Sequence, residues 1–395
     1  MNKIKLGIDL INQKKFNKTL IGNVALLAHS ASFNQDLCHS AEIIQTSIGK
    51  RLIKLFGPQH GFVTDVQDNM VETKDFIHPY FKIPVHSLYG EVRKPTEDML
   101  SDVDTFVIDL QDVGTRVYTY IHTLNYVLES CLEKKIKVVV LDRPNPIGGK
   151  IIEGNILDSE FASFVGLHPI PMRHGLTIGE MALYINEYFL NKKCELEVIK
   201  MDGWSREYFW GDINRQWILP SPNLPTWEGT IAFVGSVLFE GTNISEGRGT
   251  TRSLEIIGHP KLEAFNFSKK FNEVIRKNNL SGMIARPQVF LPTFQKWQGR
   301  VCQGIQLHTT NAHQARPWRV GQLLCREIIN ELGEDFSWSK SPYEYQFKGY
   351  AIDFINGTDK IRHWAETNGE LGDLIGIEKA GHAEFLERAN SIQLY

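Results

Sequence analysis

The sequence predicts an α/β protein in which a doubly wound, mostly parallel sheet is followed by a smaller α+β domain. Short apolar runs rich in β-branched residues alternate with amphipathic segments over the first half of the chain. This is the pattern of a parallel sheet whose two faces are covered by helices. The runs end in clusters of polar residues. After Gly203 the alternation stops and proline-punctuated segments begin. We therefore expect two domains, residues 1–202 and residues 203–395.

The predicted strands of the first domain are short and mostly apolar. The clearest one covers residues 105–110, and polar residues follow it directly in the stretch D-V-G-T-R-V-Y-T-Y. Helices are expected at 40–48, after Thr96, up to about Lys134 and after Thr177, where Glu180 stands at capping-box spacing. Residues 63–79 have no clean period and are expected to form a loop or lid. The remaining strands are predicted at 21–28, 51–56, 85–88, 137–141 and 195–201.

The second domain is expected to mix strands and helices without a repeat. Prolines exclude an interior helix over 218–225, and 239–251 is a glycine-rich polar loop. Strands are predicted at 231–239 and 301–309, and helices at 262–277 and 320–332. The last 45 residues are expected to hold one or two short helices.

Composition narrows the class of protein. Lysine and arginine number 43 against 46 acids, for a net charge of −3. The chain therefore has no excess positive charge that would attract nucleic acid or an anionic membrane. No apolar run reaches the ~18 residues that a membrane span requires. The N-terminus does not read as a secretory signal, and the five cysteines are scattered as in reduced proteins. We expect a cytoplasmic protein; the oligomeric state is open.

Nucleotide, metal and serine-hydrolase sites are not predicted. The first strand runs into A-H-S-A-S-F-N, which has no glycine where a dinucleotide fold needs G-x-G-x-x-G. The later E-G-R-G-T-T lacks the lysine of a phosphate-binding loop, and there is no H-E-x-x-H, C-x-x-C or G-x-S-x-G. A metal triad of His60, His122 and His174 is weakly indicated, and histidines that serve as hydrogen-bonding groups are favoured. We expect no cofactor.

Several polar loops that can converge on one cleft suit a sugar ligand. Carboxylates, amides and arginines match sugar hydroxyls, and tryptophans either stack on pyranose faces or pack in the core. Glycoside cleavage needs a protonated acid, usually beside a second carboxylate, and Asp112, Glu240 and Glu246 are candidates that the sequence does not rank. The loops are 59–60, 67–72, 112–120, 142–145, 173–174, 221–226 and 240–248, and the tryptophans are Trp204, Trp210, Trp217 and Trp227.

Ordered motifs across nearly the whole chain carry a family resemblance. They are G-P-Q-H-G-F, P-V-H-S-L-Y-G-E-V-R-K-P-T, D-L-Q-D-V-G-T-R-V-Y-T-Y, L-D-R-P-N-P-I-G-G, I-P-M-R-H-G-L-T-I-G-E, P-S-P-N-L-P-T and F-E-G-T-N-I-S-E-G-R-G-T-T. Together they resemble the NamZ-type exo-β-N-acetylmuramidases, glycoside hydrolase family 171. The resemblance implies a Rossmann-like domain joined to a smaller domain, with the active site in the cleft between them. It also implies release of N-acetylmuramic acid from the non-reducing end of peptidoglycan fragments, without metal or nucleotide.

One position departs from that family. The family usually has P-E-H-G, whose glutamate is its leading candidate for the catalytic acid, and here Gln59 stands in that place. A carboxamide cannot donate a proton to a leaving oxygen at neutral pH. Either another acid replaces it, or the substrate or reaction differs, or catalysis is weak or lost. The first hypothesis names Glu72 or Asp112 as the replacement, and the alternative is a catalytically altered or inactive sugar-binding homologue.

The matched motifs supply the remaining candidate site residues. The predicted catalytic set is Glu72, Asp112, Glu246 and His60, in which His60 orients the acid. Arginines suit the lactyl carboxylate of muramic acid because a guanidinium meets a carboxylate through two parallel hydrogen bonds. Asn223 and Asn243 suit the acetamido group or ring hydroxyls. The predicted substrate-binding residues are Gln59, Arg116, Tyr118, Arg143, Asn145, Arg173, His174, Asn223, Glu240, Asn243 and Arg248.

Overall fold

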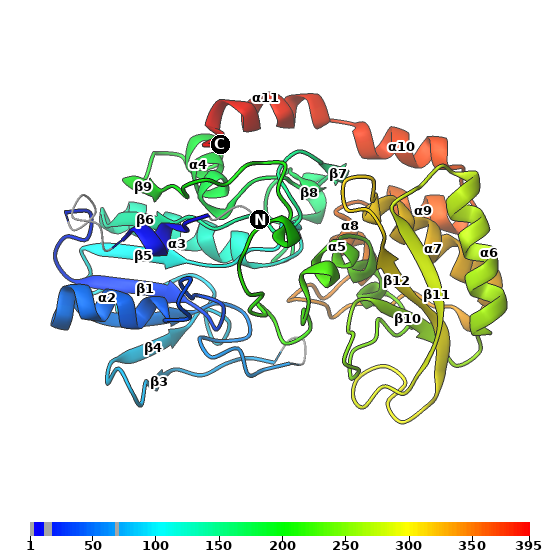
Figure 1. Ribbon diagram of the computed structural model, residues 1–395, viewed down its shortest axis with the longest axis horizontal. Helices are drawn as coiled ribbons and strands as arrows, with labels where there is room; N and C mark the ends of the chain where they lie inside the picture. Colours follow the sequence, from blue (N-terminus) through cyan, green and yellow to red (C-terminus); the bar gives the residue numbers. More distant parts are fainter. Residues whose placement is uncertain (1–3, 12–17, 68–70) are drawn as a thin grey trace.

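The computed structural model describes residues 4–11, 18–67 and 71–395 and contains a seven-stranded sheet (Figure 1). The strand order is β3-β4-β2-β1-β5-β6-β9, and every neighbouring pair is parallel except β3 with β4. This confirms the predicted mostly parallel sheet. Two local predictions were wrong: β3 lies inside the segment 63–79 that was expected to be a loop or lid, and residues 97–102 after Thr96 form turns and not a helix. The strands are β1 (Val24–Ala28), β2 (Leu52–Gly57), β3 (Phe76–Ile77), β4 (Pro84–Ser87), β5 (Thr105–Asp109), β6 (Lys137–Leu141) and β9 (Leu196–Ile199).

The central strands are buried on both faces because the sheet is covered on both sides. Every residue of β1 and β5 is buried. Along β1, Val24, Leu26 and Ala28 pack into one apolar core, whereas Ala25 and Leu27 pack into the other. Successive side chains of a strand point to opposite faces. Helices α1 and α2 contribute to the first core, and α3 and α4 to the second. The helices are α1 (Gly7–Leu10), α2 (Ser40–Ile48), α3 (Tyr120–Lys134) and α4 (Ile178–Tyr188).

Helix α4 begins at the predicted capping box. The Thr177 hydroxyl accepts a hydrogen bond from the Glu180 N–H at 3.1 Å, and the Glu180 carboxylate accepts one from the Thr177 N–H at 3.0 Å. Between the sheet's last strands the chain also forms a small antiparallel pair, β7 (Glu153–Ile156) and β8 (Pro171–Arg173).

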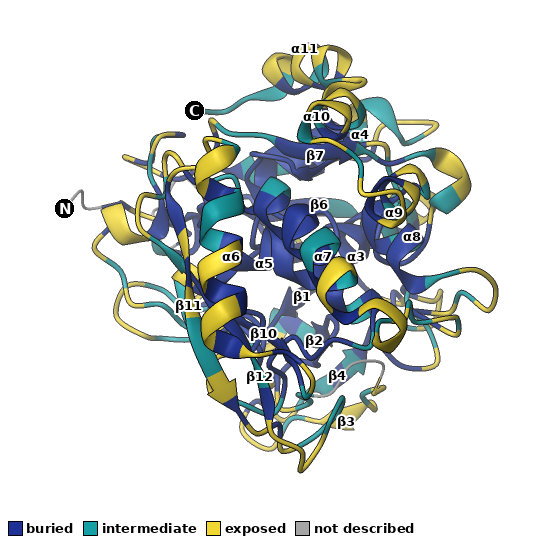
Figure 2. Ribbon diagram, turned by 90° about the vertical axis from the view of Figure 1, so that its right-hand side faces the viewer, coloured by how far each residue is buried: buried dark blue, intermediate teal, exposed yellow. Residues whose placement is uncertain are grey.

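The smaller domain packs helices against a three-stranded antiparallel sheet of order β10-β12-β11. Helices α6 and α7 turn apolar faces inward and leave their outer faces exposed (Figure 2). The apolar core on the α3 side of the large sheet continues into this domain, because Leu124, Phe233 and Ile305 belong to one cluster of buried residues. The elements are α5 (Trp227–Ser236), the 3-10 helix η4 (Val237–Gly241), β10 (Ile256–His259), α6 (Ala264–Lys277), β11 (Met283–Phe290), β12 (Cys302–Thr309) and α7 (Pro317–Leu332).

The end of the chain returns to the first sheet. Helix α11 packs on α4 (Figure 1). The Tyr395 hydroxyl donates to Asp142 at 2.6 Å and accepts from the Met201 N–H at 2.7 Å. This returning segment therefore ties the end of the smaller domain back to the first sheet. Other contacts between the two halves of the chain surround the cavity described in the next subsection. The last helices are α8 (Ala351–Asn356), α9 (Lys360–Glu366), α10 (Leu371–Lys379) and α11 (His382–Ile392).

Two sequence predictions in this half were wrong. Residues 231–239 are not a strand but the end of α5 and the start of η4. A short run that is apolar all round does not distinguish a buried helix from a buried strand, and residues 229–236 are all buried. The last 45 residues form four helices, α8 to α11, and not one or two. Two glycines with positive φ divide this segment: Gly357 (φ 69°) ends α8 and Gly381 (φ 81°) precedes α11.

Among the described residues, no helix combines the length and apolar character needed to cross a bilayer.

Candidate functional site

A small cavity lies between the two domains at the carboxyl ends of the large sheet. The loop after β2 supplies Gln59 and His60, and the segment after β5 supplies Tyr118, Thr119 and Tyr120. The facing wall comes from the second half of the chain, and the cavity volume is about 50 Å³. We call it the reacting cavity. Its lining residues are Gln59, His60, Val117, Tyr118, Thr119, Tyr120, Val165, Ser221, Asn223, Leu224, Phe233, Val237, Glu240, Arg248, Leu254, Tyr343 and Glu344.

The turn that carries Gln59 is tight. A Cβ on Gly57 would lie 2.4 Å from the backbone nitrogen of Phe62, so the chain can fold back after β2 only because Gly57 has no side chain. His60 and Gly61 follow with φ of 71° and 80°. This geometry turns the Gln59 side chain toward Thr119, whose hydroxyl donates to the Gln59 carbonyl oxygen at 2.6 Å.

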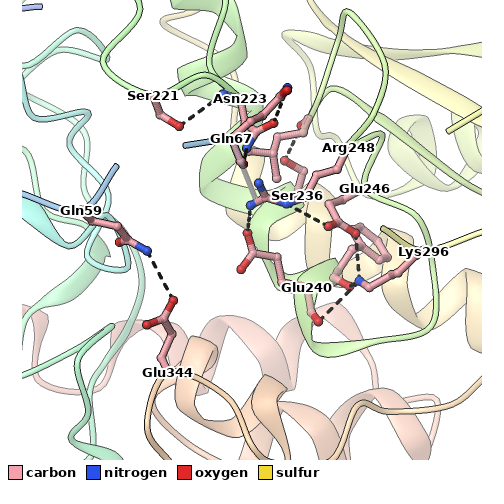
Figure 3. Close-up of polar contacts among 12 residues, drawn as sticks. Gln59, Gln67, Ser221, Asn223, Ser236, Glu240, Glu246, Arg248, Lys296 and Glu344 are labelled. Carbon is pink, nitrogen blue, oxygen red and sulfur yellow. Dashed lines mark hydrogen bonds and ion pairs between the residues drawn. The ribbon is translucent and has the colours of Figure 1, made fainter. Parts of the chain in front are cut away.

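The Gln59 amide contacts a glutamate that the sequence analysis did not identify. Its Nε2 donates to Oε1 of Glu344 at 3.4 Å (Figure 3). The Tyr89 hydroxyl donates to both oxygens of the same carboxyl group, at 3.2 and 3.0 Å. Glu344 itself has φ of 40°, a left-handed conformation that is uncommon for glutamate and recurs at functional sites. The amide, the phenol and the carboxyl group thus form one buried cluster.

Burial raises the pKa of Glu344 to about 7. Repulsion from Glu240 acts in the same direction, whereas the hydrogen bonds from Tyr89 and Gln59 act against it. Desolvation disfavours the charged form of a carboxyl group. Near neutral pH a large fraction of Glu344 therefore keeps its proton. A carboxyl group in that state can donate the proton to a leaving oxygen.

A second carboxyl group in the cavity belongs to an ion pair. Glu240 pairs with Arg248 (Figure 3). It also accepts a hydrogen bond from the Tyr343 hydroxyl at 3.0 Å. Arg248 also donates through Nε to Glu246 at 3.1 Å, and Lys296 donates to Glu246 at 2.8 Å. The Arg248 Nη1 atom is buried and has no hydrogen-bond partner among the described residues. Arg248 therefore retains a donor for a ligand.

Glu246 lies behind Arg248 and not on the cavity wall. Burial alone would raise the pKa of Glu246, but the charges of Lys296 and Arg248 outweigh it and hold that pKa below its ordinary value. Glu246 therefore stays ionised and orients Arg248. Glu246 was predicted as a catalytic residue, and the structure places it in contact with Arg248 and Lys296.

His60 is neutral and bridges two loops. Its Nδ1 lies 2.9 Å from the Val66 carbonyl oxygen, and its Nε2 lies 3.2 Å from the Ser221 hydroxyl. Because a carbonyl only accepts, Nδ1 carries the proton and Nε2 accepts from Ser221. Burial lowers the His60 pKa to about 4, with Arg248 acting in the same direction. His60 lines the cavity, and Val66 and Ser221 hold its two ring nitrogens.

Asn223 and Tyr118, two of the predicted substrate-binding residues, also line the cavity. Asn223 Nδ2 donates to the Gln67 carbonyl at 2.8 Å, and its Oδ1 accepts from Gln67 Nε2 at 3.3 Å. The Tyr118 hydroxyl donates to the Pro220 carbonyl at 2.9 Å. These bonds tie the loop after β2 and the segment after β5 to residues 220–223. The cavity is therefore closed by groups from both halves of the chain.

Neither acid proposed to replace the missing glutamate lies in this cavity. Glu72 is exposed and pairs with Arg93 at 3.4 Å. Asp112 is buried, accepts from the Gly114 N–H at 2.7 Å and lies 3.4 Å from His174 Nε2. Glu72 and Asp112 do follow strands of the large sheet, β2 and β5, in the chain. The sequence does not indicate where their side chains point.

Three of the four candidate arginines are committed elsewhere. Arg116 donates to the carbonyl groups of four residues, Asn155, Ile170, Ile355 and Asn356. Arg143 forms two hydrogen bonds to the buried Asp109, and Arg173 pairs with the buried Glu153 at 2.8 Å. Arg116 and Arg173 each keep a buried Nε without a partner among the described residues, but none of these three arginines lines the reacting cavity. Only Arg248 of the four lines the reacting cavity.

The two other predicted amides hold backbone turns. Asn145 donates to the Leu176 carbonyl at 3.0 Å and accepts from the Ile147 N–H at 3.1 Å. Asn243 donates to the Asp335 carbonyl at 2.8 Å and accepts from the Ser337 N–H at 3.0 Å, away from the cavity. The described part of the chain also contains no group of three or more histidine, cysteine, aspartate or glutamate residues arranged to hold a metal ion.

Glu344, which keeps a proton near neutral pH, and the ion-paired carboxylate of Glu240 form the kind of carboxyl pair that glycoside hydrolases use. Comparison with known protein families identifies which glycoside hydrolases this chain resembles. Residues 24–228 match the N-terminal part, and residues 231–395 the C-terminal part, of the exo-β-N-acetylmuramidase NamZ family. The chain belongs to this family.

Relatives cover the whole chain. The peptidoglycan β-N-acetylmuramidase NamZ of Bacillus subtilis (strain 168) is 42% identical over 394 residues, which cover 100% of this chain and 92% of that protein. A crystal structure of a DUF1343 family protein from Bacteroides fragilis is 29% identical with a TM-score of 0.87, over 100% of this chain and 99% of the other. A second B. fragilis DUF1343 protein, at 24% identity and a TM-score of 0.74, covers the same shares and shows the fold. The chain is thus an exo-β-N-acetylmuramidase-type glycosidase by family, and it shares the fold of the two DUF1343 proteins.

Proposed function

We propose that this protein removes N-acetylmuramic acid from the non-reducing end of peptidoglycan fragments in the reacting cavity, with Glu344 as the general acid. The observation that carries the proposal is the Gln59–Glu344 contact of 3.4 Å. It places a carboxyl group with a pKa of about 7 directly beside the position where the family usually has a glutamate. The activity of the B. subtilis relative supports the substrate class.

The roles of the other groups follow from their contacts. Glu240, paired with Arg248, supplies the second carboxylate that acts as base or nucleophile. The free Nη1 of Arg248 takes the lactyl carboxylate of muramic acid. Gln59 and Tyr89 hold the Glu344 carboxyl group in place, and Asn223 is placed to meet the acetamido group.

Substrate entry requires the reacting cavity to widen. Its volume of about 50 Å³ admits one or two water molecules. A pyranose is several times larger. Tyr343 and Glu344 lie on a tight backbone bridge between Tyr343 and Gln346, and we propose that this segment moves away from Gln59 when the sugar enters.

The presence of Glu344 favours hydrolysis over the alternative of an inactive sugar-binding homologue. An inactive binder would need no protonated carboxyl group beside Gln59. We further propose a cytoplasmic role in cell-wall recycling, on soluble fragments. The net charge of −3 and five cysteines that are all free support it, and all five lie in the described part of the chain.

Activity on a chromogenic β-N-acetylmuramide tests the function. The wild-type protein should release the chromophore, Glu344→Gln should lose most of that activity, and the exposed Glu72→Gln should keep it. An inactive wild-type protein that still binds N-acetylmuramic acid would support the binding homologue instead.

A further inference from the structure

A second and much larger cavity lies on the same edge of the large sheet. It is lined by Phe33 and Asn34 after β1, Gln111 after β5 and Arg143 after β6, and residues 210–218 cover it. Its volume is about 500 Å³, within the range of small-molecule sites. The strand order reverses at β1, whose neighbours are β2 and β5. The crevice outside the carboxyl ends of the strands at such a switch point is where open α/β sheets bind ligands.

Two of the residues that line this cavity each carry a buried polar atom without a partner among the described residues. These atoms are Oε1 of Gln111, a residue 1% exposed, and Nε1 of Trp210, a residue 6% exposed. The Gln111 amide nitrogen donates to the carbonyls of Asp112 and Pro144, at 2.9 Å each. This fixes the amide and leaves its oxygen to accept. An unsatisfied buried donor or acceptor costs about 1–3 kcal/mol. A ligand that donates to Gln111 and accepts from Trp210 would satisfy both atoms.

The rest of the lining indicates a neutral, hydroxyl-rich ligand. Both lining cations are already paired, Arg143 with Asp109 and Arg215 with Asp9 at 2.8 Å. Aromatic faces beside amides suit a sugar, whose ring has an apolar face and a rim of hydroxyls. The lining amides and rings include Asn34, Gln111, Asn214, Trp210, Trp217 and Trp227.

A nucleotide fits this crevice poorly. The loop after β1 has no glycine to let a pyrophosphate approach the backbone, and Ala31 and Phe33 line the cavity there. Helix α2 begins at Ser40, and one N–H of its first turn, that of Ala41, is already taken by the His39 ring at 3.1 Å. Phosphate groups usually bind at the positive, N-terminal end of a helix. In α2 the His39 side chain already occupies part of that end.

We propose that this switch-point cavity is a second saccharide-binding site, separate from the reacting cavity, which holds an uncharged N-acetylhexosamine unit or a short chain of them. The two cavities share a wall. Trp217 lines the larger one, and its Nε1 donates at 3.1 Å to the carbonyl of Leu224, which lines the reacting cavity. Uncharged N-acetylhexosamine units that accompany muramic acid in a glycan fragment would then be held beside the reacting site. The choice of an N-acetylhexosamine rests on the proposed function, whereas the assignment of the cavity to a saccharide does not.

The test is binding of N,N′-diacetylchitobiose, which has no lactyl carboxylate, measured by isothermal titration calorimetry. Asn214 is exposed on the cavity lining, so Asn214→Trp should fill the cavity without disturbing the core. It should weaken binding by about tenfold or more, which is about 1.4 kcal/mol. Gln216→Ala, which only removes an exposed amide, should weaken it less. The matched control is Asn266→Trp, on the exposed face of α6.

The control and Glu344→Gln should bind chitobiose like the wild type, and Asn214→Trp should keep wild-type activity on a small chromogenic muramide. The proposal is overturned if wild-type protein does not bind chitobiose, or if Asn214→Trp and Gln216→Ala leave the affinity unchanged. It is also overturned if Asn214→Trp lowers chitobiose affinity and muramide activity together, since the two cavities would then be one site. Loss of activity in Glu344→Gln with normal chitobiose binding separates the two proposals.

Discussion

Replacing Glu344 by glutamine removes the proton that the proposed mechanism transfers, while the shape of the side chain is kept. General acid catalysis contributes roughly 10²–10⁴-fold to a rate, so kcat on a β-N-acetylmuramide with a poor leaving group should fall by that factor. A leaving group that needs no proton, such as a dinitrophenolate, should be far less affected. The contrast between the two substrates separates loss of the acid from a general loss of structure.

The pH dependence follows from the same group. The acid must be protonated to act, and its pKa is about 7. The wild-type kcat/KM should therefore fall about tenfold for each pH unit above about 7. In Glu344→Gln this alkaline decline should disappear from the residual activity. A wild-type decline that persists unchanged in the variant would assign the titration to another group.

Stability gives an independent reading of the same titration. Because the folded-state pKa of Glu344 is raised, the stability linked to its proton is complete below the ordinary value of 4.5 and is lost as pH rises through about 7. A rise from 4.5 to about 7 corresponds to about 3 kcal/mol, at 1.36 kcal/mol for each pH unit. The difference in unfolding free energy between wild type and Glu344→Gln should change by about this amount between about pH 4 and pH 8. Equal pH profiles of stability would show that Glu344 is not held protonated by the fold, and would refute the reasoning.

Three further predictions concern other groups. Gln59→Glu should move the alkaline limb of kcat/KM to higher pH, because two carboxyl groups in contact cannot both ionise easily; an unchanged profile would argue against that contact. Arg248→Lys should weaken binding of a muramide more than that of a glucosaminide without the lactyl group, by about 1–3 kcal/mol for a charged hydrogen bond, and equal losses for both sugars would reject its role. Tyr395→Phe should lower the unfolding free energy by about 1–3 kcal/mol, since Asp142 and the Met201 N–H lose a buried partner, with kcat unchanged; a denaturation curve like that of the wild type would contradict this.

The sheet was predictable because burial on two faces leaves a local signature. Runs such as 105–109 and 137–141 are apolar and β-branched, and both form central strands. The Thr177–Glu180 capping box is equally local and was confirmed. Helix α5 was mistaken for a strand because its residues are apolar on all sides, which removes the periodic signal.

The site was only partly predictable because its chemistry is set by distant partners. Gln59 and Glu344 are 285 residues apart in the chain, and the segment Y-E-Y around Glu344 carries no periodic or motif signal. From the sequence alone, four arginines were equally suitable to bind the lactyl carboxylate. Only the fold shows that Arg116 meets backbone carbonyls and that Arg248 lines the cavity. Local patterns give elements, whereas the direction of a polar side chain depends on tertiary packing.

The most direct test of the central claim is a crystal structure of the Glu344→Gln variant with an uncleaved disaccharide of N-acetylmuramic acid and N-acetylglucosamine. The side chain at position 344 should lie within about 3 Å of the glycosidic oxygen, with Arg248 on the lactyl carboxylate. A glycosidic oxygen that faces Asp112, Glu72 or bulk solvent, with position 344 out of reach, would contradict the account.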